Sequence, residues 1–234
     1  MTALKVKSDL KKLGSVTRAK HSKRFFKAGP GEYGEGDLFI GVTVPNQRKV
    51  AKSYKDLSFS EIKKLLDSRI HEHRLTALII LVGQYQKGDK DQKQRVFNFY
   101  LDNLKGVNNW DLVDTSAHKI IGAHLLNNHL QRKILHNYAR SDDLWLRRIA
   151  VISTFAFIDN EQYEDSLKIA ETLLHDEEDL IHKAVGWMLR ELGKKNQVKE
   201  ENFLLKHHKD MPRTMLRYSI EKFSLAKRKR YMAR

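Results

Sequence analysis

Cysteine is absent from the 234 residues of this chain. Without a thiol the protein can form neither a disulfide framework nor a thiolate nucleophile, and zinc sites made of four sulfurs are excluded. We therefore expect a reducing cytoplasm. Long apolar stretches are lacking too, since the longest runs from Ala77 to Val82, far short of the ~20 residues that span a bilayer. The sequence predicts no transmembrane helix and no membrane partner.

Helix-breaking residues are scarce and gathered in one place. Five of the 12 glycines and two of the three prolines lie between residues 29 and 45, which predicts one long irregular loop. Beyond it, apolar residues recur at helical spacing, as at Leu75, Leu78, Ile79 and Val82, and no run is typical of a strand. The predicted helices span residues 46–54, 59–69, 71–86, 90–104, 109–126, 129–139, 143–158, 160–174, 177–194, 198–208 and 212–225.

Successive amphipathic helices with short polar joints predict an all-α fold. We expect an α-solenoid, in which each helix pair buries its apolar face against neighbouring pairs. The repeats are degenerate, with a period of about 35 residues, and a compact irregular helical bundle is the alternative. The expected organisation is a single domain over residues 1–234, with basic segments at 1–27 and 226–234.

The net charge of +15 is concentrated at the two ends of the chain. Residues 1–27 hold nine Lys/Arg and one acid, residues 222–234 hold six and no acid, and the residues between them are left with a net charge of +1. Basic ends favour a polyanion partner, because neutralising phosphates releases counterions. The alternative explanation of the basic ends is that they serve only to keep the protein soluble. For the N-terminal segment we expect a short basic helix that joins the fold. A mitochondrial presequence is the alternative, although no cleavage site is evident.

A tryptophan and an aspartate lie one turn apart in a predicted helix. At this spacing Trp110 and Asp114 share one helix face, and an aromatic ring beside a carboxylate suits a flat, cationic ligand. Taken singly, a tryptophan more often fills core, and a lone aspartate more often caps a helix or forms an ion pair. The other two tryptophans each lie within one turn of an arginine, Arg148 or Arg190. An arginine is more often solvated, but three such clusters together favour a binding site.

Two common kinds of site are not predicted. The glycines at 29–36 lack a Gly-Lys-Ser/Thr ending and do not follow a strand, so they do not indicate ATP binding. The 11 histidines include His71-x-His73 and His207-His208 but no His-Glu-x-x-His pattern, and without cysteine a metal site has little support. We therefore expect no metal and interpret the histidines as ordinary surface, cap or core residues.

Four motifs, in this order, resemble the AlkD-type DNA alkylation-repair glycosylases, which are HEAT-like repeat DNA glycosylases. The motifs are the glycine-rich stretch between Phe25 and Arg48, Trp110-Asp111-x-x-Asp114, Asp143-x-Trp145-Leu146-x-Arg148, and Lys183-Ala184-x-Gly186-Trp187-x-Leu189-Arg190-Glu191. The likeness covers most of the chain. It implies a solenoid of HEAT-like helical repeats whose concave, basic face binds double-stranded DNA.

The resemblance also implies an activity. It is the removal of positively charged N3- or N7-alkylated purines, such as 3-methyladenine and 7-methylguanine, by hydrolysis of the N-glycosidic bond in base excision repair, without base flipping. Asp114 would be the catalytic carboxylate, and Trp110 and Trp187 would pack against the deoxyribose. The residues expected to bind DNA are Arg148, Arg190, Lys183, Arg147 and Tyr33. No cofactor is implied, and we expect a monomer.

The chemistry of such a lesion agrees with a carboxylate at position 114. An alkylated purine already carries positive charge and leaves without a strong general acid, so positive charge builds on the sugar. A carboxylate beside C1′ stabilises that oxocarbenium character and can position the attacking water, and indole faces stabilise the same cation. A non-catalytic binder of duplex or branched DNA and a protein-interaction scaffold are the alternatives. A carboxylate among phosphate-binding groups favours the glycosylase over these alternatives, because a groove that only binds phosphates has no use for an acid.

Overall fold

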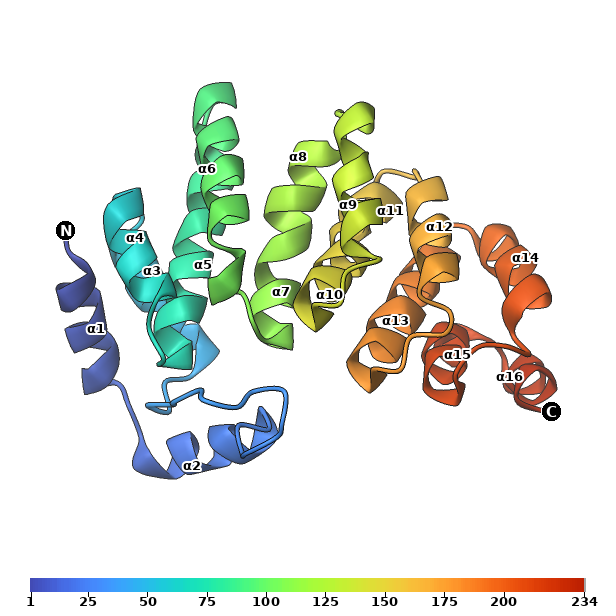
Figure 1. Ribbon diagram of the computed structural model, residues 1–234, viewed down its shortest axis with the longest axis horizontal. Coiled ribbons are helices and arrows are strands. Elements are labelled where there is room, and N and C mark those ends of the chain that lie inside the picture. The colour runs from blue at the N-terminus through green and yellow to red at the C-terminus, as the bar shows by residue number, and fades with distance from the viewer. Residues whose placement is uncertain (234) are drawn as a thin grey trace. The chain divides into compact units, whose positions relative to one another are not determined.

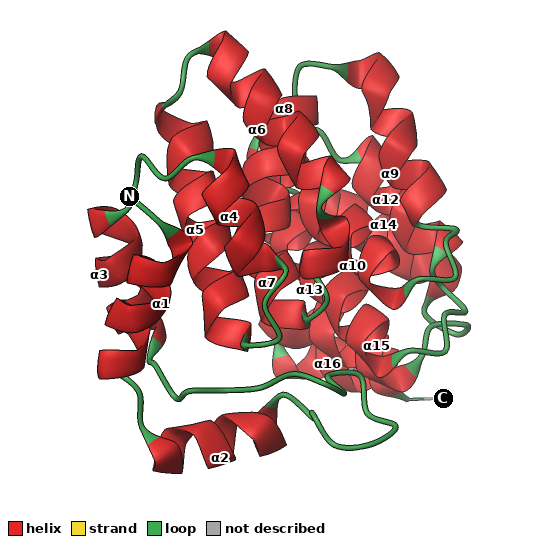
Figure 2. Ribbon diagram, turned by 60° about the vertical axis from the view of Figure 1, so that its left-hand side comes forward, coloured by secondary structure: helices red, strands yellow, loops and turns green. Residues whose placement is uncertain are grey.

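The structure, a computed structural model, describes residues 1–233. These residues form helices and loops without any strand (Figures 1 and 2), apart from one isolated β-bridge between Leu38 and Ile70. This confirms the predicted all-α fold class. The chain divides into two compact units, Met1–Ile120 and Ile121–Arg234, and the single domain stays a prediction. Within residues 1–233 no helix has the length and apolar character needed to cross a membrane.

The first unit is a series of helices that pack on their neighbours in the sequence, as in an α-solenoid. Both α3 and α4 pack on α5, which also contacts α6 and α7, and in Figure 1 this series runs from blue to green. A 3-10 turn precedes α7, and a π-helical turn follows it. The elements are α1 (Ala3–Lys12), α2 (Val16–Phe25), α3 (Val44–Ser53), α4 (Phe59–Leu66), α5 (His71–Lys87), α6 (Lys90–Asp102), η1 (Leu104–Gly106), α7 (Trp110–Ala117) and η2 (His118–Gly122).

The central helix of this unit is α5, which is buried over most of its length. Leu75, Leu78 and Val82 of the predicted apolar stripe are buried, whereas Ile79 is half-buried. Because α3, α4, α6 and α7 all contact this helix, its polar first turn is buried as well. That turn carries the residues that anchor the candidate site.

The basic N-terminal segment forms two helices. α1 buries Ala3, Val6 and Leu10 and contacts α3 and α4, so it is part of the fold of this unit. α2 has no buried residue, and the glycine-rich loop of residues 26–43 follows it. Thr2 and Ser15 cap the two helices through their side-chain oxygens, which satisfies backbone N–H groups of the first turn.

The second unit is organised around α13, which contacts α10, α11, α12, α14 and α15. The basic C-terminal segment forms the last helix, α16, where Tyr231 is buried and packs beside Phe223 with ring centroids 5.8 Å apart. The elements of this unit are α8 (Ala123–Leu125), η3 (His129–Arg132), α9 (Lys133–Tyr138), α10 (Leu144–Ser153), α11 (Phe155–Asp159), α12 (Glu164–Thr172), α13 (Asp179–Lys195), α14 (Gln197–His207), α15 (Arg213–Ser219), η4 (Ile220–Lys222) and α16 (Leu225–Met232).

Two predicted helices are interrupted in the structure. The helix expected over 109–126 changes to a π-helical turn at His118, and the helix expected over 143–158 is divided at Thr154. Thr154 donates its hydroxyl to the carbonyl of Val151 at 2.7 Å, and such a bond competes with the regular helical pattern. The helices expected over 129–139 and 212–225 each contain a 3-10 turn.

Gly186 lies where α13 and α15 meet. A Cβ atom at this position would lie 2.5 Å from the carbonyl oxygen of Met215 and 2.6 Å from Cβ of Tyr218. We expect Gly186→Ala to lower the free energy of unfolding by about 1–3 kcal/mol, because α15 would have to move away. Urea denaturation measures this loss.

Gly83→Ala is the matched control, because this glycine is also helical but nothing lies within 4 Å of its Cβ position. Alanine there should stabilise α5 by up to about 1 kcal/mol through its higher helix propensity. Equal midpoints for the Gly186 and Gly83 variants would contradict a close approach of α15 to α13.

Candidate functional site

Trp110 and Asp114 lie one turn apart on α7, as their spacing predicts. Asn109 is the N-cap of this helix, and its side-chain oxygen accepts the backbone N–H of Trp110 at 2.8 Å. Leu112 and Val113 of the same helix are fully buried, whereas the indole and the carboxylate are both half-buried. The packing of α7 therefore leaves part of Trp110 and Asp114 accessible.

An aromatic stack supports the indole from the side of the glycine-rich loop. The ring of Phe26 stacks on Trp110 with a centroid distance of 5.3 Å, and Phe39 stacks on Phe26 at 5.4 Å. Phe25 meets the indole edge-on at 5.8 Å. Because Phe26 occupies one indole face, a ligand that contacts Trp110 must use the other face or an edge of the ring.

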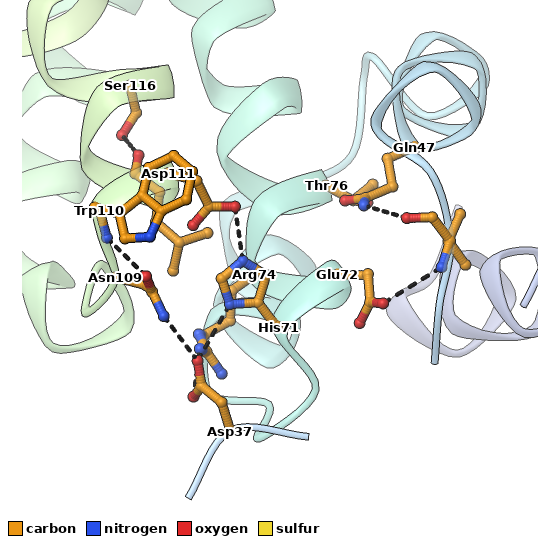
Figure 3. Close-up of polar contacts among 12 residues, drawn as sticks. Asp37, Gln47, His71, Glu72, Arg74, Thr76, Asn109, Trp110, Asp111 and Ser116 are labelled. Atoms are coloured by element: carbon orange, nitrogen blue, oxygen red, sulfur yellow. Dashed lines mark hydrogen bonds and ion pairs between the residues drawn. The ribbon is translucent and has the colours of Figure 1, made fainter. Parts of the chain in front are cut away.

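A buried histidine links the glycine-rich loop to α7. His71, the first residue of α5, is 2% exposed. Its Nδ1 lies 3.2 Å from Oδ2 of Asp37, and its Nε2 lies 2.8 Å from Oδ2 of Asp111 (Figure 3). The rings of Phe26 and Phe39 pack on the imidazole, with centroids at 4.7 and 5.1 Å. The same phenylalanine thus contacts both His71 and Trp110.

This histidine is positively charged at neutral pH. Burial disfavours its charged form, but the hydrogen bonds to Asp111 and Asp37 outweigh burial and raise the pKa of His71 to about 9. Both ring nitrogens then carry protons and donate to the carboxylates. The cation also lies against two aromatic faces, which favours its charge further.

Arg74 completes a charge-balanced cluster with His71. The Nη2 of Arg74 donates to Oδ1 of Asp37 at 2.7 Å. Burial opposes the charge of Asp37, yet His71 and Arg74 hold the pKa of its carboxyl below the usual value. Two carboxylates thus face two cations, which is how buried charges are tolerated. The cluster ties α5 to Asp111, the residue that follows Trp110.

This cluster was not predicted from the sequence. Asp37 and His71 are 34 residues apart, and no short motif connects them with Asp111. His71 is a core residue, which was one of the expected alternatives. It is not an ordinary one, because its charged ring joins the carboxylates of Asp37 and Asp111. The only available signals were an acid within the glycine-rich loop and two basic residues, His71 and Arg74, in the first turn of a predicted helix.

A cavity of about 220 Å³ lies beside the cluster. Phe26, Phe39, His71, Glu72 and Asp111 contribute to its lining. The carboxylate of Glu72 accepts backbone N–H groups of the glycine-rich loop, the shortest at 2.7 Å, and so fixes the loop against α5. Within residues 1–233, no group of three or more His, Asp or Glu side chains could hold a metal ion.

Tyr33 is half-buried in the glycine-rich loop of the first unit. The ammonium of Lys27 lies 5.9 Å from the centroid of its ring. The loop thus carries Phe39 into the aromatic stack and holds Tyr33 near a lysine. The DNA-binding role of Tyr33 stays a prediction.

The second unit carries the other predicted site residues. Trp187 is half-buried on α13 and donates its indole N–H to Glu191 at 3.1 Å. Glu191 also pairs with Arg190 at 3.2 Å, and Arg190 forms a second ion pair with Glu221. Glu191 therefore orients both the predicted indole and the predicted phosphate-binding arginine.

The remaining predicted cations also have protein partners. Arg148 is only 5% exposed and donates to the carbonyl of Leu180 at 2.6 Å. Arg147 donates to Asp176 at 2.7 Å, and Lys183 pairs with Asp179 at 2.6 Å. Arg147 and Arg148 thus connect α10 to the region around the start of α13, and DNA binding by these residues stays a prediction.

The fold and side chains described above define a class: an all-α helical-repeat protein with an indole and a carboxylate on one helix. Residues 6–223 match the sequence profile of the DNA alkylation repair enzymes, and the chain belongs to this family. A solved structure described as a "predicted DNA alkylation repair enzyme" from Enterococcus faecalis is similar, with a TM-score of 0.71 and 17% identity over 91% of this chain and 97% of that chain. That likeness shows a common fold. No curated protein matched the sequence.

Proposed function

We propose that the protein is a DNA glycosylase that excises positively charged N3- and N7-alkylated purines, including 3-methyladenine and 7-methylguanine, from double-stranded DNA. Membership in the family of DNA alkylation repair enzymes supports alkylation repair in general. The more specific proposal, glycosylase activity, rests on the placement of Trp110 and Asp114 one turn apart on α7, where both are half-buried. A carboxylate in that position has a use in glycosidic hydrolysis and none in simple phosphate binding.

In the proposed reaction the bond between C1′ and the purine nitrogen breaks, and its electron pair neutralises the cationic base. The deoxyribose gains oxocarbenium character, which the carboxylate of Asp114 stabilises electrostatically. Water then forms the new C1′–O bond and loses a proton to Asp114 or to solvent. The accessible part of Trp110 packs against the sugar. The products are the free alkylated base and an abasic site, the usual intermediate of base excision repair.

Further assignments follow from the resemblance and are part of the proposal. Trp187 is the second indole that contacts deoxyribose, and DNA lies on a concave basic face without base flipping. The proposed phosphate-binding residues are Arg148, Arg190, Lys183, Arg147 and Tyr33. For the arginines and the lysine, a phosphate would have to compete with the protein partners described above. We propose that the protein acts as a monomer without a cofactor.

The direct test is to incubate the purified protein with methylated duplex DNA and to identify released bases by chromatography. We expect release of 3- or 7-methylpurine and formation of abasic sites. The same duplex carrying hypoxanthine, a neutral purine, should release no base, because the neutral leaving group lacks the positive charge that drives departure. Tight DNA binding without any release would instead support the non-catalytic binder.

A further inference from the structure

A half-buried lysine follows the proposed catalytic helix. Lys119 is the second residue of the π-helical turn η2, which begins directly after α7. It lines a cleft of about 500 Å³ in the first unit together with Thr115, the residue that follows Asp114. Four residues of helical backbone separate Thr115 from Lys119, and this spacing places both on one side of the helix. The side chain of Lys119 therefore borders a cleft that adjoins the helix of the proposed catalytic carboxylate.

The surroundings of Lys119 disfavour its positive charge. Of the four lysines among the described residues that line the cleft, Lys119 is half-buried, whereas Lys52, Lys55 and Lys87 are exposed. Burial, and next the nearby Arg48, lower the pKa of Lys119 from its ordinary value of 10.5. Within residues 1–233 no acidic group raises this pKa again, and none of the described residues that line the cleft is a carboxylate.

A lysine in such surroundings is suited to attack an aldehyde. The amine is nucleophilic only when neutral, and lysines that form Schiff bases in enzymes are desolvated or lie beside another cationic group. Lys119 meets both conditions, because the cleft has apolar residues such as Ile79 and Ile80 in its lining and Arg48 lies nearby. The proposed glycosylase reaction also produces an aldehyde, since the sugar of an abasic site opens to a free aldehyde at C1′.

We propose that Lys119 forms a Schiff base with the abasic site and that the protein is therefore also an abasic-site lyase. This activity rests on the proposed function only for the origin of its substrate, because the glycosylase reaction would supply the abasic site. The attack on the aldehyde itself requires neither Trp110 nor a damaged base. The lyase is thus a second activity, with its own nucleophile and its own product.

The lyase reaction breaks the strand on the 3′ side of the abasic site. The Nζ atom of Lys119 bonds to C1′ of the aldehyde, and loss of water leaves a protonated imine. The imine withdraws electrons, so that Asp114 or water removes a proton from C2′. The electron pair of this C–H bond forms the C2′=C3′ double bond, and the C3′–O bond breaks to release a strand with a 5′-phosphate. Water then hydrolyses the imine, which frees Lys119 and leaves an unsaturated aldehyde on the other strand end.

The test uses duplex DNA with one preformed abasic site, so that it does not depend on base release. Sodium borohydride reduces the imine to a stable amine and thereby joins protein to DNA, which denaturing gel electrophoresis detects. Lys119→Arg keeps the positive charge but has no nucleophilic amine. Lys52→Arg is the matched control, the same change at an exposed lysine of the cleft. Circular dichroism checks the folding of both variants.

We expect the wild type and Lys52→Arg to be trapped equally, and trapping of Lys119→Arg to be at least about tenfold lower, because a guanidinium is not deprotonated in proteins. Trapping of the wild type should rise with pH and level off below 10.5, the ordinary pKa of a lysine. Mass spectrometry of the trapped wild type should locate the adduct on Lys119. Equal trapping of all three proteins, or an adduct on another amine, would overturn the proposal. Absence of any adduct would overturn it too and leave Lys119 as a simple cation.

Release of bases from methylated DNA is measured separately, so the lyase and the glycosylase proposals fail independently. Base release by the wild type without trapping overturns the lyase alone. Trapping at Lys119 without base release supports the lyase and overturns the glycosylase, and another enzyme must then supply the abasic site. If both occur, the wild type should cut methylated DNA where bases are lost, and Lys119→Arg should leave the abasic sites uncut.

Discussion

Asp114→Asn is expected to slow release of alkylated purines by at least about 10²–10³-fold, the usual effect of removing a group that stabilises charge in the transition state. Asparagine has nearly the shape of aspartate but no negative charge, so the oxocarbenium character on the sugar loses its counter-charge. DNA affinity should be nearly unchanged, because a carboxylate contributes no attraction to phosphates. Single-turnover release of methylated bases at saturating DNA measures the loss.

Asp102→Asn is the matched control for this substitution. Asp102 is an exposed carboxylate at the end of α6 in the same unit, and its loss changes the net charge of the protein equally. Both variants should bind DNA slightly more tightly than the wild type, because one repulsive charge is gone. Only the Asp114 variant should lose base release. Full activity in Asp114→Asn would remove the carboxylate from the proposed mechanism.

Local spacing was enough to predict the face of α7 on which Trp110 and Asp114 lie. The periodicity of apolar residues likewise predicted an all-α chain and most of its helices, because a helix needs only its own sequence to establish which residues share a face. Interruptions such as the one at Thr154 were missed, because they depend on single side-chain bonds. The expected short basic helix that joins the fold at the N-terminus is confirmed by α1, whereas the helix α16 at the basic C-terminal end was not predicted, because few apolar residues mark it.

Contacts between distant segments could not be read from the sequence. The resemblance assigned Arg148 and Arg190 to backbone phosphates, and this assignment stays a prediction. The sequence did not show that the fold also brings the carbonyl of Leu180 and the carboxylate of Glu221 to these arginines. A pattern of charges identifies basic residues, whereas their freedom to bind an anion depends on which acids the fold places beside them.

His71→Gln is expected to cost the first unit about 3 kcal/mol of stability near pH 7, the order of loss seen when one partner of a buried ion pair is removed. The substitution leaves Asp111 without its cation and weakens the link between the glycine-rich loop and α7. Urea denaturation monitored by circular dichroism measures the change.

The pH dependence of this stability has a defined sign. The pKa of His71 is raised from 6.5 to about 9 in the folded protein, so the folded state binds the proton more tightly than the unfolded chain. The stabilisation is therefore fully present below pH 6.5 and is lost as the pH rises through about 9. The wild type should lose stability over this window, and His71→Gln should lack that part of the decrease.

His73→Gln provides a matched control two residues further along α5. His73 is also buried, and its Nδ1 lies 2.9 Å from the hydroxyl of Ser68. Burial, followed by Lys7 and Arg74, lowers its pKa to about 4, so it is neutral at pH 7. Its substitution should therefore leave the alkaline decrease in place. An alkaline decrease of wild-type size in His71→Gln would assign that decrease to another group.

The same protonation should influence the proposed chemistry through Trp110. Asp111 directly follows the indole, and Phe26 contacts both the imidazole and the indole. Loss of the proton on His71 should therefore loosen the start of α7. We expect base release by the wild type, measured at saturating DNA, to decrease as the pH rises through about 9. Base release by His71→Gln should be slower than that of the wild type at pH 7, and it should not decrease further as the pH rises through about 9. A purely structural loss at a distance from α7 would not remove this pH dependence.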